Sequence, residues 1–270
     1  HQIEGGNTNN NWYQFETLER YEGDTEEPSG SAAGSWEGFE SDLDLAAGLG
    51  LGHFRMSVEW SRLEPVRDSW DEAAFDRYLD ILDGVRARGL EPSVTLHHFT
   101  EPIWVQDLSE EYCNEGPTDE NLCGWTNPEV AEEFAEFATE VASRFGDRVD
   151  RWNTFNEPMV YLIGGYVFGS FPPGDVNLLT EDLLDDVVPV ISGMLDGHAG
   201  AYHGVHGADL VDANGDGVTA EVGFTDAVVW FEPADPDEPE DLVAAAKAKS
   251  FYQYTFADPV INGLFDHHLD

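Results

Sequence analysis

Basic residues are scarce in this sequence, whose 270 residues include 12 lysines and arginines against 55 aspartates and glutamates. The formal net charge is -43, and the acidic residues are spread along the whole chain. Such a surface repels phosphate backbones, so we expect no nucleic-acid partner. It also repels itself unless salt screens it, which favours a halophilic protein over an ordinary acidic one. Stabilisation by molar salt would separate these two interpretations.

Long apolar runs are also absent, since no stretch of eighteen apolar residues occurs, and we expect no membrane partner. Cysteine is nearly absent: Cys113 and Cys123 flank a polar loop and form either a disulfide or two free thiols. A disulfide would favour an extracellular protein, whereas free thiols would fit a cytoplasmic one. No signal peptide is visible, but the chain opens at His1 without an initiator Met, so this tells little.

What the sequence does contain is enough apolar and aromatic material for a sizeable core, at 41% and 12% of residues, which excludes disorder. Several segments alternate apolar and polar residues as strands do. They are HFRMSVEW (53–60), EPSVTLHHF (91–99), VDRWNTFNEP (149–158) and EVGFTDAVVWFEP (221–233), and the opening HQIEGG (1–6) predicts the end of an earlier strand.

Helix-like stretches lie between these segments. From Asp71 to Arg88 the apolar residues recur at helical spacing, and Gly89 stands where a C-terminal cap belongs. A second amphipathic stretch begins at Asn127, a predicted N-cap that is followed by Pro128, and closes at Gly146.

Strands that alternate with helices predict parallel βαβ units, which build either a doubly wound sheet or a barrel. No Gly-rich phosphate fingerprint follows a strand, and this favours the barrel. Five units cannot close a barrel that needs eight. We therefore expect an α/β fold, a TIM (β/α)8 barrel that is incomplete, with residues 1–270 forming a single catalytic domain truncated at both ends.

The segment WNTFNEP (152–158) carries the strongest chemical signal. In a barrel, side chains at the carboxyl ends of the strands face the active site, so Glu157 is expected to point its carboxyl group into a pocket beside Asn156. A carboxylic acid in that place can protonate a glycosidic oxygen, and the amide can hold a sugar hydroxyl. The alternative is a Glu that merely caps the next helix.

The order of the motifs resembles glycoside hydrolase family 1. FRMSVEWSR, VTLHHF, GW before a helix, FGDRVDRW, TFNEP and GYVFGSFPPG follow one another as in that family, with HQIEGG at the start and FADPVINGLF near the end. They span nearly the whole chain and resemble the N-terminal half, or slightly more, of a β-glucosidase-like enzyme. The resemblance implies a (β/α)8 barrel and retaining hydrolysis of β-linked sugars.

The same resemblance assigns roles to individual residues. Glu157 matches the acid/base, and Arg55 matches the arginine that lies under the nucleophile. Gln2, His98 and Asn156 match residues that bind the sugar, Asn156 at its 2-hydroxyl. Phe99 stands where many members have Trp, so it keeps a face for stacking on a sugar but loses the indole N–H. Thr100 and Glu101 stand where many members have Asp-Leu.

One element of the family pattern does not occur in these residues: the Thr/Ile-Glu-Asn-Gly segment that carries the nucleophile. Retaining hydrolysis needs two carboxyl groups, so we expect the chain alone to be inactive. Glu59 shares inward parity with Arg55, but we do not expect it to replace the nucleophile. A non-catalytic carbohydrate-binding barrel remnant is the alternative function, and another barrel glycosidase with an Asn-Glu-Pro acid/base, such as an endoglucanase, is a third.

Weaker signals concern metals. Asp212, Asn214 and Asp216 have the spacing of a calcium loop, but its twelfth position is Gly223, which favours a solvated Asx-rich turn. His198 and its neighbouring histidines form no HExxH pattern, so packing explains them better than zinc. We expect no metal and no other cofactor, and a small-molecule β-glycoside or oligosaccharide as a partner; the sequence leaves the oligomeric state open.

Overall fold

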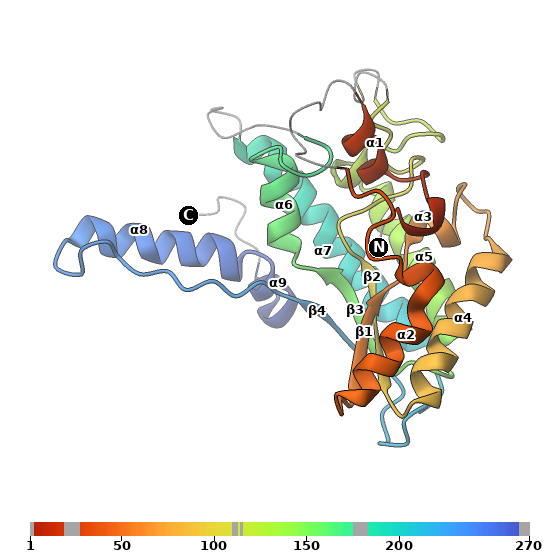
Figure 1. Cartoon of the computed structure of the whole chain (residues 1–270). Helices are drawn as coiled ribbons and strands as arrows, with labels where there is room; N and C mark the ends of the chain where they lie inside the picture. The colour runs from red at the N-terminus through yellow and green to blue at the C-terminus, as the bar shows by residue number, and fades with distance from the viewer. Residues whose placement is uncertain (1–2, 19–27, 110–112, 114–115, 175–182, 265–270) are drawn as a thin grey trace.

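The computed structural model describes residues 3–18, 28–109, 113, 116–174 and 183–264. In these residues one parallel sheet has four strands, each beside the next one in the sequence (Figure 1). The strands are β1 (His53–Ser57), β2 (Glu91–His97), β3 (Arg151–Asn156) and β4 (Glu221–Thr225). Since all four run the same way, their carboxyl ends meet at one edge of the sheet. The predicted parallel βαβ units are confirmed.

Three long helices join the strands: α4 (Glu72–Ala87) follows β1, α5 (Glu129–Phe145) follows β2, and α7 (Leu183–Ala208) precedes β4. The remaining elements are shorter or flank the sheet. They are α1 (Asn11–Thr17), α2 (Ser35–Gly48), α3 (Trp60–Leu63), α6 (Pro158–Tyr166), α8 (Pro239–Lys249), α9 (Ala257–Asn262), the 3-10 helices η1 (Glu4–Gly6) and η3 (Gly124–Thr126), and the π-helix η4 (Ser250–Tyr254). Figure 1 shows α8 and the segment that leads to it projecting away from the rest.

The two predicted helices begin close to the residues predicted to cap them. The carboxylate of Asp71 accepts hydrogen bonds from the N–H groups of Ala73 and Ala74, at 2.9 and 3.1 Å, and α4 starts at the next residue. At the start of α5 the side chain of Asn127 accepts the N–H of Glu129 at 3.1 Å. The predicted start of α4 is confirmed, whereas α5 begins at Glu129, one residue later than predicted, with Pro128 rather than Asn127 as its N-cap.

The core lies between the sheet and its covering helices and is built largely from aromatic rings. Trp60 stacks on Phe137 of α5 with ring centroids 5.1 Å apart, and Trp125 meets Phe155 of β3 at 5.3 Å. Trp152 is also buried, and its indole N–H donates to Asp209 at 2.9 Å. Burial of each such side chain contributes on the order of 2–3 kcal/mol, which fixes the sheet against α5.

Helix α7 packs closely on α5 and η3 through a row of glycines. A Cβ atom at Gly193 would lie 2.3 Å from the carbonyl oxygen of Trp125, and one at Gly204 would lie 2.2 Å from the hydroxyl of Thr139. Gly197 and Gly200 stand on the same seam. Any larger side chain there would push α7 outward.

Two predicted strands differ from the structure. The strand expected over residues 221–233 ends at Thr225, because its neighbour β3 ends at Asn156 and offers no further backbone for pairing. In the opening HQIEGG, Glu4–Gly6 form a 3-10 helix rather than a strand, since Gly5 and Gly6 adopt positive φ angles of 60° and 76° that turn the chain. His1 and Gln2 lie outside the described residues.

Cys113 and Cys123 form a disulfide, which decides between the two alternatives that the sequence left open. Within the described ranges, no helix combines the length and the apolar character needed to cross a membrane.

Candidate functional site

Glu157 stands at the carboxyl end of β3, where the chain turns into α6. Its backbone has φ 46° and ψ 63°, a left-handed conformation that is unusual for a residue with a side chain. Its N–H donates to the carbonyl of Thr225 at 2.7 Å, and its own carbonyl accepts the N–H groups of Val160 and Tyr161 in α6. These three backbone bonds and Pro158, at the first position of the helix, hold the strained turn in place.

A line of polar contacts connects Glu157 to the two preceding strands. The guanidinium of Arg55 donates through Nη2 to Asn156 Oδ1 at 2.7 Å and through Nε to Thr95 Oγ1 at 3.0 Å. The other end of the Asn156 amide donates through Nδ2 to Glu157 Oε2 at 3.2 Å. Removal from water lowers the pKa of Arg55, and the negative charge of Glu157 opposes that shift. The arrangement therefore orients the amide and the carboxylate together.

His98 lies beside this line, just beyond β2. Its Nδ1 is 2.8 Å from the hydroxyl of Ser57, so the ring is oriented by β1. Burial, with the charge of Arg55 and the neighbouring His97, lowers the pKa of His98 to about 4. The imidazole is consequently neutral near pH 7, a form that can both donate and accept a hydrogen bond.

Phe99 occupies a different position from the polar residues. Its backbone has φ 72°, and the residue is only 9% exposed because its ring packs on Tyr161 and Phe171, with centroids 6.4 and 5.3 Å away. Little of the ring is therefore left for stacking on a sugar. Of the sequence-predicted residues, Arg55, Asn156 and Glu157 are joined by hydrogen bonds; Gln2 lies outside the described residues.

Sequence reasoning missed several groups that border the site. Thr95 holds Arg55, and its inward parity on β2 could have revealed it. Asp226 follows directly after β4; burial raises the pKa of its carboxyl, and the charge of Glu157 adds to the rise. Burial likewise raises the pKa of Tyr252, with contributions from the same two carboxylates. No sequence motif marks Asp226 or Tyr252.

A cavity of about 480 Å³ opens beside β1. Arg55, Ser57 and His98 form one part of its wall, and Trp36 of α2 and Tyr78 of α4 contribute aromatic surface. Its remaining polar lining is acidic or hydroxylic and includes Glu4, Ser35, Asp42 and Glu59. The cavity therefore borders two of the sequence-predicted site residues, Arg55 and His98.

A buried carboxylate lies beneath the turn that carries His98 and Phe99. Glu101 has no exposed surface, and its Oε1 accepts hydrogen bonds from His97 at 2.7 Å, Tyr161 at 2.8 Å and Trp125 at 2.9 Å. Its Oε2 accepts the amide of Asn11. Burial alone would raise the pKa of Glu101, but the hydrogen bonds and the charge of His97 lower it overall. The carboxylate thus ties α1, β2, η3 and α6 together.

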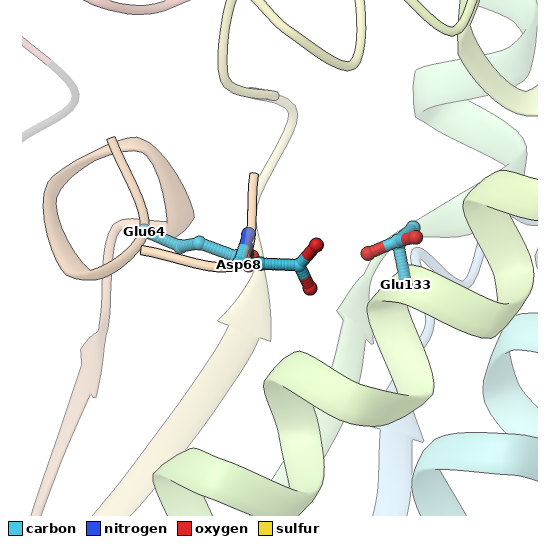
Figure 2. Close-up of side chains that lie close together, drawn as sticks. All are labelled: Glu64, Asp68 and Glu133. Carbon is cyan, nitrogen blue, oxygen red and sulfur yellow. Dashed lines mark hydrogen bonds between the residues drawn. The ribbon is translucent and has the colours of Figure 1, made fainter. Parts of the chain in front are cut away.

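Figure 2 shows the one group of three carboxylates in the described residues whose oxygens lie close enough to hold a cation: Glu64, Asp68 and Glu133. Protein donors already engage two of them. Glu64 accepts the indole N–H of Trp60 at 2.7 Å and the N–H of Asp68 at 2.9 Å, while Arg67 donates to Glu133 through Nε at 2.9 Å. Burial, with the charges of Glu133 and Asp68, raises the pKa of Glu64 to about 7. Two of the three carboxylates therefore already have hydrogen-bond donors within the protein.

The weaker metal signals also have internal explanations. The carboxylate of Asp212 accepts the N–H groups of Gly215, Asp216 and Gly217, which is the Asx-rich turn that the sequence favours. His198 is buried, and its Nδ1 lies 2.7 Å from the hydroxyl of Thr154. Burial lowers the pKa of His198 to about 4, as expected for a packed core histidine.

Comparisons with known proteins bear on the whole chain. Residues 1–270 match the model of glycosyl hydrolase family 1. A β-galactosidase of Pyrococcus woesei is 31% identical over 272 residues, which cover 87% of this chain and 52% of that protein. The chain therefore spans about half the length of this relative.

Solved structures that resemble this chain are also glycosidases of about twice its length. A β-glycosidase from Pyrococcus horikoshii is 31% identical with a TM-score of 0.78, over 98% of this chain and 54% of that one. A mutant of a rice β-glucosidase in a covalent complex with Glc is 28% identical with a TM-score of 0.72, over 86% of this chain and 46% of that one. The four-strand sheet is accordingly part of the TIM-barrel fold of these enzymes.

Proposed function

The chain belongs to glycosyl hydrolase family 1, and we propose that it contributes Glu157 as the acid/base to retaining hydrolysis of O-glycosyl bonds in β-glycosides. The observation that carries this proposal is the hydrogen-bonded line from Thr95 through Arg55 and Asn156 to Glu157, at the carboxyl edge of a parallel sheet. The relatives are a β-galactosidase and a β-glucosidase, so the proposed substrate is a β-glucoside, a β-galactoside or a related oligosaccharide.

Each residue of the line has a role in this chemistry. The carboxyl group of Glu157 protonates the glycosidic oxygen as the bond to the leaving group breaks, and the resulting carboxylate then removes a proton from the attacking water. Asn156 has its oxygen engaged by Arg55, so its Nδ2 hydrogens serve both Glu157 and the sugar 2-hydroxyl. Neutral His98, together with Gln2, binds further hydroxyls of the same sugar ring.

Retention of configuration requires a second carboxyl group about 5 to 5.5 Å from the first. The covalent complex of the rice enzyme with Glc is the kind of species that such a nucleophile forms. Arg55 supports this role here, because a cation beside the reaction centre favours a charged carboxylate. The second candidate is a barrel that binds carbohydrate without cleaving it.

The coding sequence beyond codon 270 defines the polypeptide in which activity is measured. If it continues in frame through a Glu-Asn-Gly segment, that polypeptide is assayed on aryl β-glucosides whose leaving groups differ in pKa. Replacement of Glu157 by Gln should reduce turnover by about 10²- to 10⁴-fold for the poorest leaving groups and far less for the best. Equal losses for all leaving groups, or full activity, would refute the acid/base role.

A stop codon at that point changes the measurement. Binding of a thio-linked aryl β-glucoside, which resists hydrolysis, is then measured on the chain itself. Binding without turnover supports the carbohydrate-binding candidate. The absence of both binding and turnover refutes both candidates. Glu133→Gln serves as the control in either case, because Glu133 lies in the separate carboxylate group of Figure 2.

A further inference from the structure

Glu59 is a buried carboxyl group that the proposed chemistry does not use. It lies two residues beyond the end of β1, immediately before α3, and is 8% exposed. Its side chain lines the same cavity as Arg55, Ser57 and His98. A buried Glu requires strong partners, since an unpaired charge in such a place costs several kcal/mol.

The hydroxyl partners of Glu59 lie in two segments, the turn after β2 and helix α3. Thr100 donates its hydroxyl to both carboxylate oxygens, at 2.8 and 3.0 Å, and Ser61 donates to Oε1 at 3.1 Å. The hydroxyl of Ser61 in turn accepts the amide of Asn7, in the N-terminal segment. Glu59 therefore connects β1, the turn after β2 and the segment that follows Gln2.

The turn after β2 (residues 98–101) needs contacts that hold its backbone, and we call the hydrogen bonds from Thr100 to Glu59 the clamp. Phe99 has φ 72°, and a left-handed conformation costs a non-glycine residue about 1–2 kcal/mol, which the surrounding structure must offset. His98 and Thr100 flank this residue on either side. Glu101, at the end of the turn, is fixed by its hydrogen bond with His97, and Glu59 fixes Thr100 by accepting its hydroxyl. Without the second contact the His98 ring has one fewer constraint on its position.

We propose that Glu59 is a positioning residue, which accepts the Thr100 hydroxyl and thereby fixes the turn that presents His98 to the sugar. Its sugar-binding consequence rests on the proposed function, whereas its effect on His98 does not. The carboxylate form accepts both hydroxyls, so the clamp is tightest when Glu59 is ionised.

The charge state of Glu59 changes near neutral pH. Burial raises the pKa of its carboxyl group to about 7, although the Thr100 and Ser61 hydrogen bonds and the charge of Arg62 lower it in part. The titratable and charged groups around Glu59 and its cavity are Arg62 on α3, Tyr78 on α4, Asp42 on α2, Glu4 on η1, Arg55 on β1 and His98 after β2. His98 itself has its pKa near 4, so a response of its ring near pH 7 reports Glu59 rather than its own protonation.

The test uses the whole chain and follows the imidazole NMR signals of His98, assigned with a His98→Asn variant, between pH 5 and 9. In the wild type the signals should shift with a midpoint near pH 7, and Glu59→Gln should abolish that shift. Glu64→Gln is the matched control, because Glu64 is also buried with a raised pKa but contacts no residue of the turn. A His98 signal that is unchanged in Glu59→Gln, or changed equally in Glu64→Gln, overturns the inference.

Variants of Thr100 provide a second, independent test of the proposal. Thr100→Val should weaken binding of the thio-linked aryl β-glucoside by about tenfold, the worth of one hydrogen bond to a charged group, while Thr100→Ser should restore it. The double variant Glu59→Gln/Thr100→Val should bind no more weakly than Thr100→Val, and additive losses would contradict the clamp. If no variant binds the glucoside but the His98 signals still respond to Glu59, the proposed function fails and the positioning role stands.

Discussion

Replacement of Glu101 by Gln is expected to destabilise the protein far more than replacement of an acidic residue elsewhere on it. The Gln side chain keeps the shape of Glu but places an amide N–H₂ group where one carboxylate oxygen accepted a hydrogen bond. In one orientation this group faces the amide donor of Asn11; in the other it faces the donors of His97, Tyr161 and Trp125. Either way at least one buried donor loses its acceptor.

The loss in the free energy of unfolding can be worked out from these contacts. An unsatisfied buried donor costs about 1–3 kcal/mol, and loss of one partner of a buried charged network costs about 3–5 kcal/mol. We therefore expect a loss of roughly 3 kcal/mol in the free energy of unfolding at pH 7, or a Tm lower by about 6–12 °C for a chain of this size. Glu140→Gln, in a partly exposed i,i+4 ion pair with Arg144 on α5, should cost less than about 1 kcal/mol.

The effect should also depend on pH with a definite sign. The folded pKa of Glu101 is lowered, so its stabilisation is present above the unfolded value of 4.5 and is lost as the pH falls below it. Urea unfolding followed by tryptophan fluorescence at several pH values, at fixed salt, measures this. The difference between wild type and Glu101→Gln should shrink below pH 4. A difference under about 1 kcal/mol at pH 7, or one that grows in acid, would refute the account of this network.

Two further predictions concern the whole chain. Reduction of the bond between Cys113 and Cys123, which are separated by 10 residues, should lower the free energy of unfolding by about 3 kcal/mol, and the Cys113→Ser/Cys123→Ser variant should match the reduced protein; equal melting of the oxidised and reduced forms would contradict this. The net charge of -43 should make stability rise steeply when KCl is increased from dilute to molar concentration, and a Tm that does not respond to salt would reject the halophilic interpretation.

The parts of the fold that could be predicted from the sequence are those with local causes. The capping bonds of Asp71 and Asn127 involve residues two or three positions away, so their sequence signals are reliable. The end of β4 at Thr225 was not predicted, because alternation continues to Pro233 and only the end of its neighbour β3 limits the pairing. Strand ends depend on a partner that the segment itself does not encode.

The residues of the site that lie in one motif could be predicted, whereas contacts between separate segments could not. A single motif placed Asn156 and Glu157 at a strand end. The contact from Arg55 to Thr95 was not predicted, because it depends on the register in which Ser57 lies beside Thr95. The hydrogen bonds of Glu101 could not be predicted from the sequence either, since the four donors come from four separate segments of the chain. In the sequence, Glu101 is only a departure from the family pattern.

The glycine seam of α7 makes the reaction centre vulnerable to changes far from it. His198 on this helix contacts Thr154, three positions before Glu157, so a methyl group at Gly200 that shifts α7 should also shift the strand that carries the proposed acid/base. The acidic exterior carries no such constraint. A carboxylate on the surface can therefore be exchanged with little effect on this edge of the sheet, whereas any side chain at one of the four glycines should displace α7.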